Sequence, residues 1–348
     1  MRVLDSLQPR VHPRGRPSYL SQEAEFIEGD VSDHDRLGRA LTDCQFVLHL
    51  AAYQDYLPDF SRFIHTNTES TALLFELIVS DPRRYPVEKI VVASSQAVSG
   101  EGKYWCARNQ EILHPGPRPL DQLKRGQWDI LCPRCGDRAA PMLIDEATCN
   151  NPHTAYGISK YALELLAFNL GRRYEIATAA MRYTYVQGPR NSFYNAYSGI
   201  ARRFALRIRA GLAPICYEDG QQRRDYVHVD DVARANVLVL EAPTANGLAF
   251  NVGGGTPVTV LEFARVMLEE ADSKLEPIVP GQFRLGDTRH TVSDLQRITA
   301  LGWRPTKDVR TNVRDYLAWL DTQTETSEYL IEAEKIMEER GVVLRVSA

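Results

Sequence analysis

The stretch Lys89-Ile90-Val91-Val92-Ala93-Ser94-Ser95 is a short apolar run that ends in two hydroxyl side chains. A run without polar alternation is typical of a strand buried on both faces of a parallel sheet. Ligands of open α/β sheets bind outside the carboxyl ends of the strands. We therefore expect Ser95 to lie at the edge of a binding site, the alternative being that its hydroxyl only caps the following turn.

Segments before this run have a matching organisation. Runs of β character at 2–5, 25–31 and 46–52 alternate with residues of helical spacing at 33–42 and 67–80. This alternation predicts an α/β fold, a doubly wound parallel sheet with helices on both faces.

Residues 101–144 interrupt the alternation and are rich in Pro, Gly, Arg, Cys and Trp. We expect an insertion with local structure of its own, since a bare loop of that length is improbable. Its motif Cys132-Pro133-Arg134-Cys135-Gly136 is typical of a zinc knuckle, whose tight turn directs two thiolates at one ion. Cys106 would add a third thiolate, and His114 or Cys149 a fourth ligand. The alternative is a former zinc loop that holds no metal.

The rest of the chain is mainly helical. Its spacing predicts a strand at 177–184 and helices at 153–174, 198–210, 229–240, 260–271, 310–320 and 327–340. The last helix is acidic and amphipathic, and we expect it at the surface or in an interface.

Composition excludes several classes of protein. The chain has 348 residues, a net charge of −4 and 44% hydrophobic residues, which are ordinary values for a globular protein. No basic surplus indicates nucleic acid, and no apolar run is long enough for a membrane span. No apolar core follows Met1 as in a signal peptide. Six cysteines in a chain of this length do not indicate a disulfide scaffold, so we expect a cytoplasmic protein.

The strongest chemical signal is Tyr156-Gly157-Ile158-Ser159-Lys160. Residues four apart share a helix face, so the phenol and the ammonium can converge. A nearby cation favours phenolate, and Tyr156 could then act as a general base. The alternative is a solvated pair on a helix surface.

Together these motifs resemble the extended short-chain dehydrogenase/reductase family, in its NAD-dependent nucleotide-sugar epimerase/dehydratase branch. The matching segments occur in family order: Gly29-Asp30-Val31, His49-Leu50-Ala51-Ala52, Ser94-Ser95, Tyr156 with Lys160, Met181-Arg182-Tyr183, residues 219–232, residues 284–290 and Leu301-Gly302-Trp303. The resemblance implies a Rossmann-like NAD-binding domain over 1–180, a smaller substrate-binding lobe over 181–320 that is interleaved with the first domain, and a helical extension over 321–348. It also implies a homodimer that uses the Tyr156 helix.

The resemblance assigns roles to residues of three kinds. Ser95, Tyr156 and Lys160 match the catalytic triad. The residues expected to contact NAD are Asp5, Asp30, Val31, Leu50, Ala51, Ala52, Asn67, Tyr156, Lys160 and Tyr183. The residues expected to contact the nucleotide sugar are Gln96, Tyr185, Arg224, Arg284 and Arg289, since arginine forks suit phosphate. His228 is expected to pack or cap, and Asp230 and Asp231 to begin a helix.

The implied reaction is transient oxidation of the sugar at C4, which gives a nucleotide-sugar 4-epimerase for a dTDP- or UDP-linked sugar. Dehydratases of the family carry Asp-Glu after the catalytic hydroxyl, whereas this chain has Gln96 and Ala97. A decarboxylase or reductase of the same family stays open. A non-catalytic relic that acts as a binding or regulatory protein is a further alternative.

One departure from the family concerns the beginning of the chain. Family members open with a strand, a Gly-rich turn and a helix that holds the pyrophosphate. This chain begins in what resembles the second strand, through a start codon assigned too late or through truncation. We therefore expect weak or no binding of NAD.

Overall fold

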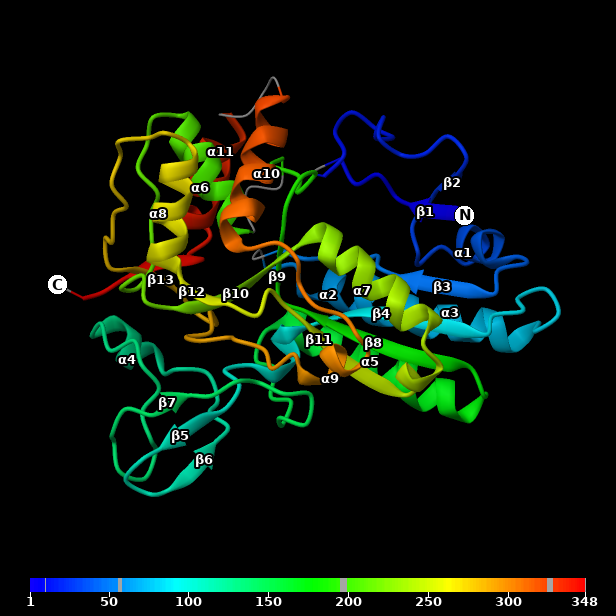
Figure 1. The fold of residues 1–348 in the computed structure, drawn as a ribbon, viewed down its shortest axis with the longest axis horizontal. Coiled ribbons are helices and arrows are strands. Elements are labelled where there is room, and N and C mark those ends of the chain that lie inside the picture. The colour runs from blue at the N-terminus through cyan, green and yellow to red at the C-terminus, as the bar shows by residue number, and fades with distance from the viewer. Residues whose placement is uncertain (10, 56–57, 195–198, 324–327, 348) are drawn as a thin grey trace.

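The computed structural model describes residues 1–9, 11–55, 58–194, 199–323 and 328–347. Its centre is a parallel four-stranded sheet in the order β11–β8–β4–β3 (Figure 1). The strands are β3 (Phe46–His49), β4 (Lys89–Ser95), β8 (Ala177–Tyr183) and β11 (Leu248–Val252). Every residue of β4 is buried, as its unbroken apolar run predicts.

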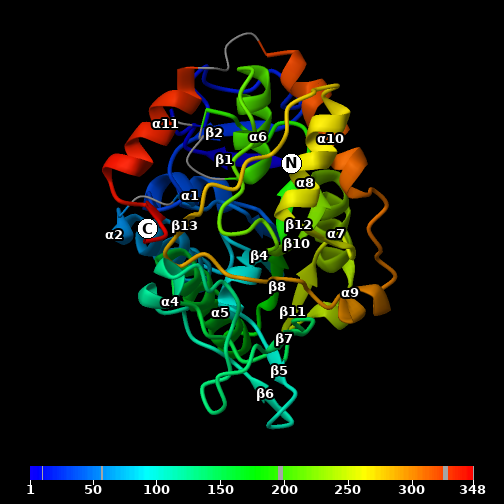
Figure 2. The same cartoon turned by 90° about the vertical axis from the view of Figure 1, so that its left-hand side faces the viewer.

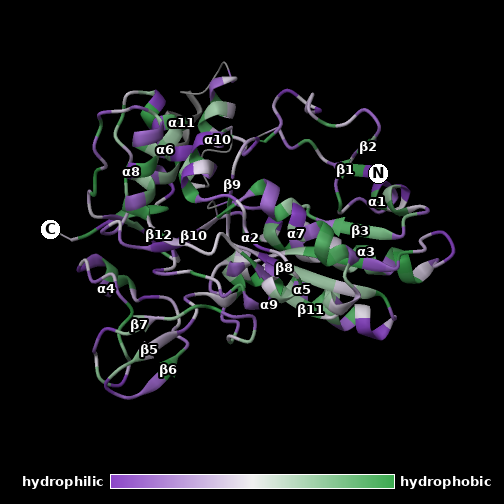
Figure 3. Cartoon of the chain, viewed as in Figure 1, coloured by the Kyte–Doolittle hydropathy of each residue, from purple (hydrophilic) through white to green (hydrophobic). Residues whose placement is uncertain are grey.

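Helices cover both faces of this sheet. Buried side chains of α1 (His34–Leu41), α3 (Ser70–Ser80) and α5 (Ala155–Arg173) form one core cluster with β4. Those of α7 (Val229–Glu241) and α9 (Gln296–Ala300) form another, with β8 and β11. The strands between them are mostly white to green in the hydropathy view (Figure 3). The predicted α/β fold is confirmed.

The first two strands do not join this sheet. Strands β1 (Arg2–Asp5) and β2 (Glu25–Glu28) form a separate parallel pair. The Arg2 guanidinium donates to the carbonyls of Ala40 and Thr42, at the end of α1. In the described part of the chain β3 is therefore an edge strand, and Phe46 is 53% exposed. The parallel sheet was expected to be continuous, but it is divided into two separate sheets, with β1 at the edge of one and β3 at the edge of the other.

A second lobe lies beside the sheet (Figures 1 and 2). Its strands are β9 (Tyr185–Gln187), β10 (Arg223–His228) and β12 (Pro257–Thr259), and β13 (Gln282–Arg284) paired with β14 (Val343–Arg345). Its helices are α6 (Ile200–Arg209), α8 (Val260–Glu270), α10 (Val309–Asp321) and α11 (Glu328–Glu339). Leu330 and Met337 of α11 are buried in the core of this lobe, while Lys335, Glu338 and Glu339 are exposed, so the terminal helix is amphipathic as expected and packs on the lobe through its apolar face.

Residues 101–144 form a small substructure, as expected. Strand β5 (Tyr104–Cys106) lies between β6 (Glu111–Leu113) and β7 (Ala140–Pro141), and α4 (Leu120–Lys124) follows β6. This substructure projects below the second lobe in Figure 1.

Most predicted helices begin and end near the expected residues. The helix expected at 67–80 differs, because α2 (Phe60–Phe63) and a π-helical segment, η1 (Ile64–Glu69), precede α3. Short 3-10 turns form at η2 (Gln96–Ser99) and η3 (Pro243–Ala245). Ser198 and Ser327, at the ends of two predicted helices, lie outside the described residues. None of the described helices combines the length and apolar character that crossing a bilayer requires.

Candidate active site

A cavity of about 1370 Å³ opens at the carboxyl edge of the sheet, against the second lobe. Ser95, Tyr156 and Tyr183 line it from the first part of the molecule, and Arg224 and Arg284 from the second. The position agrees with the rule that ligands of α/β sheets bind where the strands end.

Ser95 is the last residue of β4 and lines the cavity. Its Oγ accepts a hydrogen bond from the backbone N–H of Ala97 at 3.2 Å, so it also caps η2. Both functions anticipated for this hydroxyl are compatible, since a hydroxyl that accepts one bond can still donate its own proton.

Tyr156 lies in the first turn of α5, which is fixed by a cap. The Thr154 side chain accepts from the N–H of Gly157 at 3.0 Å. This cap directs Tyr156 into the cavity, while Lys160 lies one turn further and is buried. The Lys160 Nζ atom is 5.9 Å from the centre of the Tyr156 ring and donates to the carbonyl of Ala93 at 2.7 Å. A solvated surface pair does not describe this geometry.

Burial lowers the pKa of Lys160 to about 7. The same burial, together with the charge of Lys160, lowers the pKa of the neighbouring His49 to about 4. His49 is therefore neutral near pH 7, and Lys160, in its protonated form, is the cation that can favour a phenolate at Tyr156.

Sequence reasoning missed a buried network behind the site. Glu164, one turn beyond Lys160, accepts from Arg182 Nε at 2.9 Å and Nη2 at 2.8 Å, and from Ser94 Oγ. The four-residue spacing from Lys160 could have indicated Glu164, but its partners on β4 and β8 are distant in sequence. The network fixes α5 against the strands that end at the cavity.

Two of the predicted substrate arginines line the cavity. Arg224 lies over the ring of Tyr185 at 5.4 Å and donates to the carbonyls of Thr288 and Arg289. Arg284 pairs with Asp287 at 2.9 Å and lies 5.3 Å over Tyr217. Gln96 and Tyr185 also line the cavity.

Arg203 of α6 is a cavity arginine that the sequence patterns did not indicate. Its guanidinium also lies over Tyr217, at 4.9 Å, and its Nε is buried without a hydrogen-bond partner among the described residues. With Arg224 and Arg284 it places three guanidinium groups at this end of the cavity, of which Arg203 also pairs with Glu334 at 3.6 Å and Arg284 with Asp287 at 2.9 Å.

Arg289, the remaining predicted substrate residue, does not line the cavity. It is 1% exposed and pairs with Glu218, Asp219 and Asp129 at 2.6–3.0 Å. Its role is structural, because its charge is satisfied by these carboxylates.

His228 and the two aspartates behind it have the expected structural roles, with one difference. His228 is itself the N-cap of α7, since its Nδ1 accepts from the N–H of Asp230. Asp230 and Asp231 lie in the first turn, where the helix dipole favours them.

The predicted cofactor residues divide into two groups. Tyr183 lines the cavity with Tyr156, and its hydroxyl donates to Asn236 at 2.7 Å. The others do not line it: Asp5, Asp30, Val31, Leu50, Ala51, Ala52 and Asn67, and Lys160 lies behind Tyr156. Most of these lie at or near the split between the two sheets.

Three residues of the second group, which do not line the cavity, use their polar side chains in contacts within the protein. The carboxylate of Asp5 accepts from the N–H of Leu7, and that of Asp30 from the N–H of Ser32. Asn67 is fully buried and bonds Tyr53 and Ser159, so it joins two segments instead of facing a cleft.

Many cavity residues carry buried polar atoms without a partner in the described structure. They are Gln96, His153, Thr184, Gln187, Arg203, Gln222, Tyr226 and Thr291. Buried polar atoms are nearly always hydrogen-bonded. Their concentration here indicates a ligand with many polar groups.

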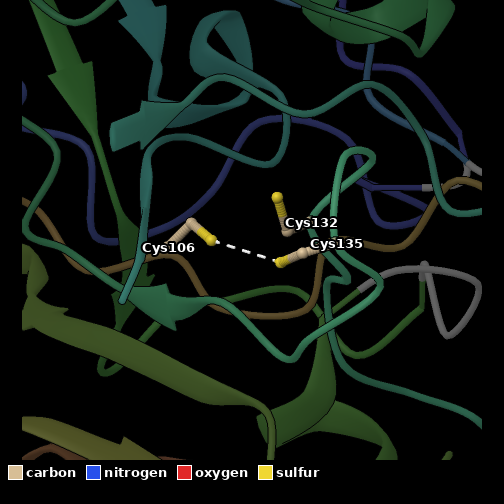
Figure 4. Close-up of side chains that lie close together, drawn as sticks. All are labelled: Cys106, Cys132 and Cys135. Atoms are coloured by element: carbon tan, nitrogen blue, oxygen red, sulfur yellow. Dashed lines mark hydrogen bonds between the residues drawn. The ribbon is translucent and has the colours of Figure 1, made fainter. Parts of the chain in front are cut away.

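The three cysteines of the predicted zinc site converge (Figure 4). The sulfurs of Cys106, Cys132 and Cys135 all lie within 4.8 Å of one another, and Asn109 Nδ2 donates to Cys132 Sγ at 3.2 Å. Neither His114 nor Cys149 belongs to this group in the described residues.

Comparison with known proteins identifies the family. The model of the NAD dependent epimerase/dehydratase family matches residues 1–119 and 135–253. The chain belongs to this family. It is 34% identical over 332 residues to dTDP-L-rhamnose 4-epimerase of Burkholderia thailandensis, with 91% of this chain and 87% of that protein covered. It is 26% identical over 329 residues to a putative UDP-glucose 4-epimerase of Methanocaldococcus jannaschii, covering 93% and 91%.

Solved structures support the same family fold. UDP-glucose 4-epimerase of Thermotoga maritima with UDP-glucose matches with a TM-score of 0.73 at 25% identity, covering 92% of this chain and 90% of that chain. The Thermus thermophilus UDP-glucose 4-epimerase complex with NAD matches with a TM-score of 0.71 at 25% identity, covering 93% and 91%.

The cofactor of this family fits the catalytic end of the cavity. Tyr156 and Tyr183 line it, and Lys160 lies directly behind Tyr156. Unpartnered polar atoms belong to Thr184, which follows Tyr183, and to Gln187, two residues beyond Tyr185. The residues present suit the polar nicotinamide end of NAD, whereas the adenosine-side residues lie outside the cavity.

Proposed function

We propose that this chain is a nucleotide-sugar 4-epimerase that uses NAD. The observation that carries the proposal is the arrangement of Ser95 and Tyr156 on one cavity, with Lys160 buried behind the tyrosine. Gln96 and Ala97 follow Ser95 where elimination of water would need a carboxylic acid and a base, which disfavours a 4,6-dehydratase.

The reaction needs a proton to leave the sugar 4-hydroxyl and later return to the same oxygen. Tyr156 is the group that moves this proton at its phenolic oxygen, and Ser95 donates a hydrogen bond to the sugar oxygen. The charge of Lys160 favours the phenolate. NAD, held with its nicotinamide end beside Tyr156, Lys160 and Tyr183, would supply the reversible hydride chemistry that inversion at C4 requires.

The substrate class follows from the arginine-lined end of the cavity and from the relatives. Arg203, Arg224 and Arg284 suit a diphosphate, which arginine binds in charge-assisted pairs. The relatives act on a dTDP-linked or UDP-linked sugar according to their names. We propose a dTDP- or UDP-linked hexose, with a deoxysugar favoured by the 34% relative.

The test is incubation of the purified chain with millimolar NAD and a panel of nucleotide sugars, dTDP-L-rhamnose and UDP-glucose among them. The expected result is conversion of one of them to its C4 epimer, with the product identified by NMR. Failure to convert any of them while NAD is bound would count against the epimerase.

The split between β1 and β3 favours a second candidate, a non-catalytic family member that binds nucleotide sugars without turning them over. The same assay separates the two, since binding of a nucleotide sugar by titration without any turnover supports this candidate. Homodimerisation and a cytoplasmic location stay predictions.

We also propose that Cys106, Cys132 and Cys135 bind a structural zinc ion. Zinc prefers four tetrahedral ligands, and thiolates are common among them. Three sulfurs already lie within 4.8 Å. The fourth ligand would be a water molecule or the Asn109 side-chain oxygen after the amide turns, since that side chain lies against Cys132.

Metal analysis of protein purified without a His tag tests this proposal. About one equivalent of zinc, lost in Cys135→Ser and retained in the matched variant Cys149→Ser, is expected. Cys149 is exposed and lies outside the cluster. A metal-free protein with a Cys106–Cys135 disulfide, detected by mass spectrometry without reductant, would contradict the zinc site.

A further inference from the structure

The segment 283–291 of the second lobe builds much of the end of the cavity proposed for the diphosphate. Arg284 belongs to this segment and lines the cavity. The carbonyls of Thr288 and Arg289 accept from a second cavity arginine, Arg224, at 2.8 and 3.0 Å. The position of the segment therefore sets where both guanidinium groups lie.

The insertion holds this segment at three points. The contacts are the Trp128 ring on Phe283 at 5.7 Å, a hydrogen bond from Arg118 Nη2 to the carbonyl of Asp287 at 2.6 Å, and an ion pair of Asp129 with Arg289 Nε at 3.0 Å. The side chains of Arg118 and Arg289 are at most 2% exposed, so their bonds form away from solvent, where they are strong. A shift of the insertion would therefore move the segment that carries Arg284.

A buried ion network locks the insertion to the second lobe. Arg118 donates to Glu101, also of the insertion, at 3.2 Å and to Glu218 of the lobe at 2.7 Å. The other oxygens of the two carboxylates accept from the backbone N–H and from Nη1 of Arg289. Both carboxylate side chains are 1% exposed, and a buried charge that loses its partner is strongly destabilised. Withdrawal of Arg118 would therefore disturb Glu218 and Arg289 together.

The insertion has a small apolar core of its own. Its buried hydrophobic cluster consists of Tyr104, Ile130 and Ala139, with Leu113 packed against it. So small a core supplies little stability, and substructures of this size are commonly stapled by a metal. The hairpin 130–139 carries two of the three clustered cysteines, and Cys106 lies on β5. An ion bound by all three joins the hairpin to the small sheet.

Asp129 directly precedes this hairpin and connects it to the lobe. Its carboxylate binds Arg138, at the other end of the hairpin, at 3.1 Å and Arg289 at 3.0 Å. The carbonyl of Arg289 in turn holds Arg224. Asp129 is thus a positioning residue, whose own place depends on the order of the hairpin.

We infer that metal binding at the three cysteines and nucleoside diphosphate binding in the cavity are coupled. The ion fixes the insertion on the second lobe, and the fixed insertion holds Arg224 and Arg284 where a diphosphate needs them. The coupled element is the insertion, either ordered on the lobe or loosened from it. Because both ligands favour the ordered state, each raises the affinity of the other by the same factor. This inference rests on the proposed nucleotide-sugar binding and the proposed zinc site.

Calorimetric titration of the full chain with dTDP and UDP, which carry the diphosphate without a sugar, tests the coupling without turnover. Zinc-loaded protein is expected to bind one of them at least about tenfold more tightly than protein stripped with a chelator. Adding ZnCl2 back should restore the affinity. Saturating nucleotide should raise the affinity for zinc by the same factor, measured by competition with a chelating dye.

Asp129→Asn tests the connection itself, because it removes the charge and keeps the shape of the side chain. The variant should retain about one equivalent of zinc, while the ratio of the nucleotide dissociation constants of stripped and loaded protein falls toward one. The matched control Asp121→Asn, at an exposed residue of α4 off the cavity, should keep the ratio of the wild type. A merely structural role of Asp129 would weaken binding in both forms and leave the ratio unchanged.

Equal affinity of zinc-loaded and stripped protein for the nucleotide would overturn the inference and leave the proposed function standing. If the stripped protein unfolds, the reciprocal measurement decides, since a zinc affinity that saturating nucleotide does not change overturns the inference. Loaded protein that binds neither nucleotide would overturn the proposed nucleotide-sugar binding as well. Protein that takes up no zinc would overturn the zinc site together with the inference.

Discussion

At the scale of single residues, the proposed chemistry depends on Tyr156 and on what surrounds it. The tyrosine is held by the cap of α5, and its neighbour Lys160 has a pKa near 7 because it is buried. The charge state of Lys160 is therefore sensitive to its environment.

Tyr156→Phe removes the hydroxyl that moves the proton and should lower kcat about 10²- to 10⁴-fold, the range for loss of a general base. Tyr161→Phe is the matched control, because Tyr161 lies on the same helix but does not line the cavity. Equal activities of the two variants at saturating NAD and sugar would contradict the assigned role.

Lys160 should also make stability depend on pH. Its pKa is about 7 in the folded chain against 10.5 unfolded. Between these values the unfolded chain holds a proton that the folded chain lacks, so stability rises with pH. The wild type should gain urea resistance between pH 7 and pH 9, and Lys160→Met should gain less. The same gain in both proteins would show that Lys160 is not responsible.

At the scale of elements, the terminal segment and the insertion both complete the second lobe. Strand β14 pairs with β13, which ends at Arg284, and Trp128 of the insertion packs on Phe283 at 5.7 Å. The insertion, which precedes the lobe in sequence, and β14, near the end of the chain, thereby both support β13, the strand that ends at the cavity.

Met337→Ala should therefore destabilise the whole lobe. Met337 is 1% exposed and belongs to the core with Phe204 and Phe263. Truncation of a buried Met to Ala costs about 2–5 kcal/mol through lost burial and a new cavity. Denaturant unfolding measures this cost, and the exposed Lys335→Ala on the same helix should change stability by less than about 0.5 kcal/mol. If Met337→Ala also lowered the free energy of unfolding by less than about 0.5 kcal/mol, the result would show that α11 does not belong to the core of the lobe.

At the scale of the whole molecule, we expect the separation of the β1–β2 pair from the main sheet to limit how tightly NAD is held. The catalytic end of the cofactor has its residues on the cavity, and the adenosine end does not. A ligand that uses only part of its contacts binds weakly.

We therefore expect this chain to bind NAD with a Kd above about 100 µM, which corresponds to a binding free energy weaker than about −5.5 kcal/mol. Epimerase activity should accordingly depend on added NAD up to millimolar concentration. Isothermal titration measures the constant directly. A Kd in the low micromolar range would show that the split between the sheets does not limit the cofactor.

The sequence by itself determined most of the elements and the proposed catalytic pair, Tyr156 and Lys160. The apolar run of β4 and the four-residue spacing of Tyr156 and Lys160 are local patterns, and a strand or helix period needs only neighbouring residues to be recognised. The order of the motifs along the chain is also enough to indicate the family, because it does not depend on how distant segments pack.

Only the tertiary structure decided which side chains face the cavity. Arg224 and Arg289 follow equally convincing motifs, yet Arg224 lines the cavity, whereas Arg289 is enclosed by the carboxylates of Glu218 and Asp219 and by that of the distant Asp129. The tertiary structure alone also decided three further features: the burial of Lys160 and Met337, the convergence of three cysteines and the split of the sheet. Each depends on close packing between segments far apart in the chain, and no local period encodes which of them meet.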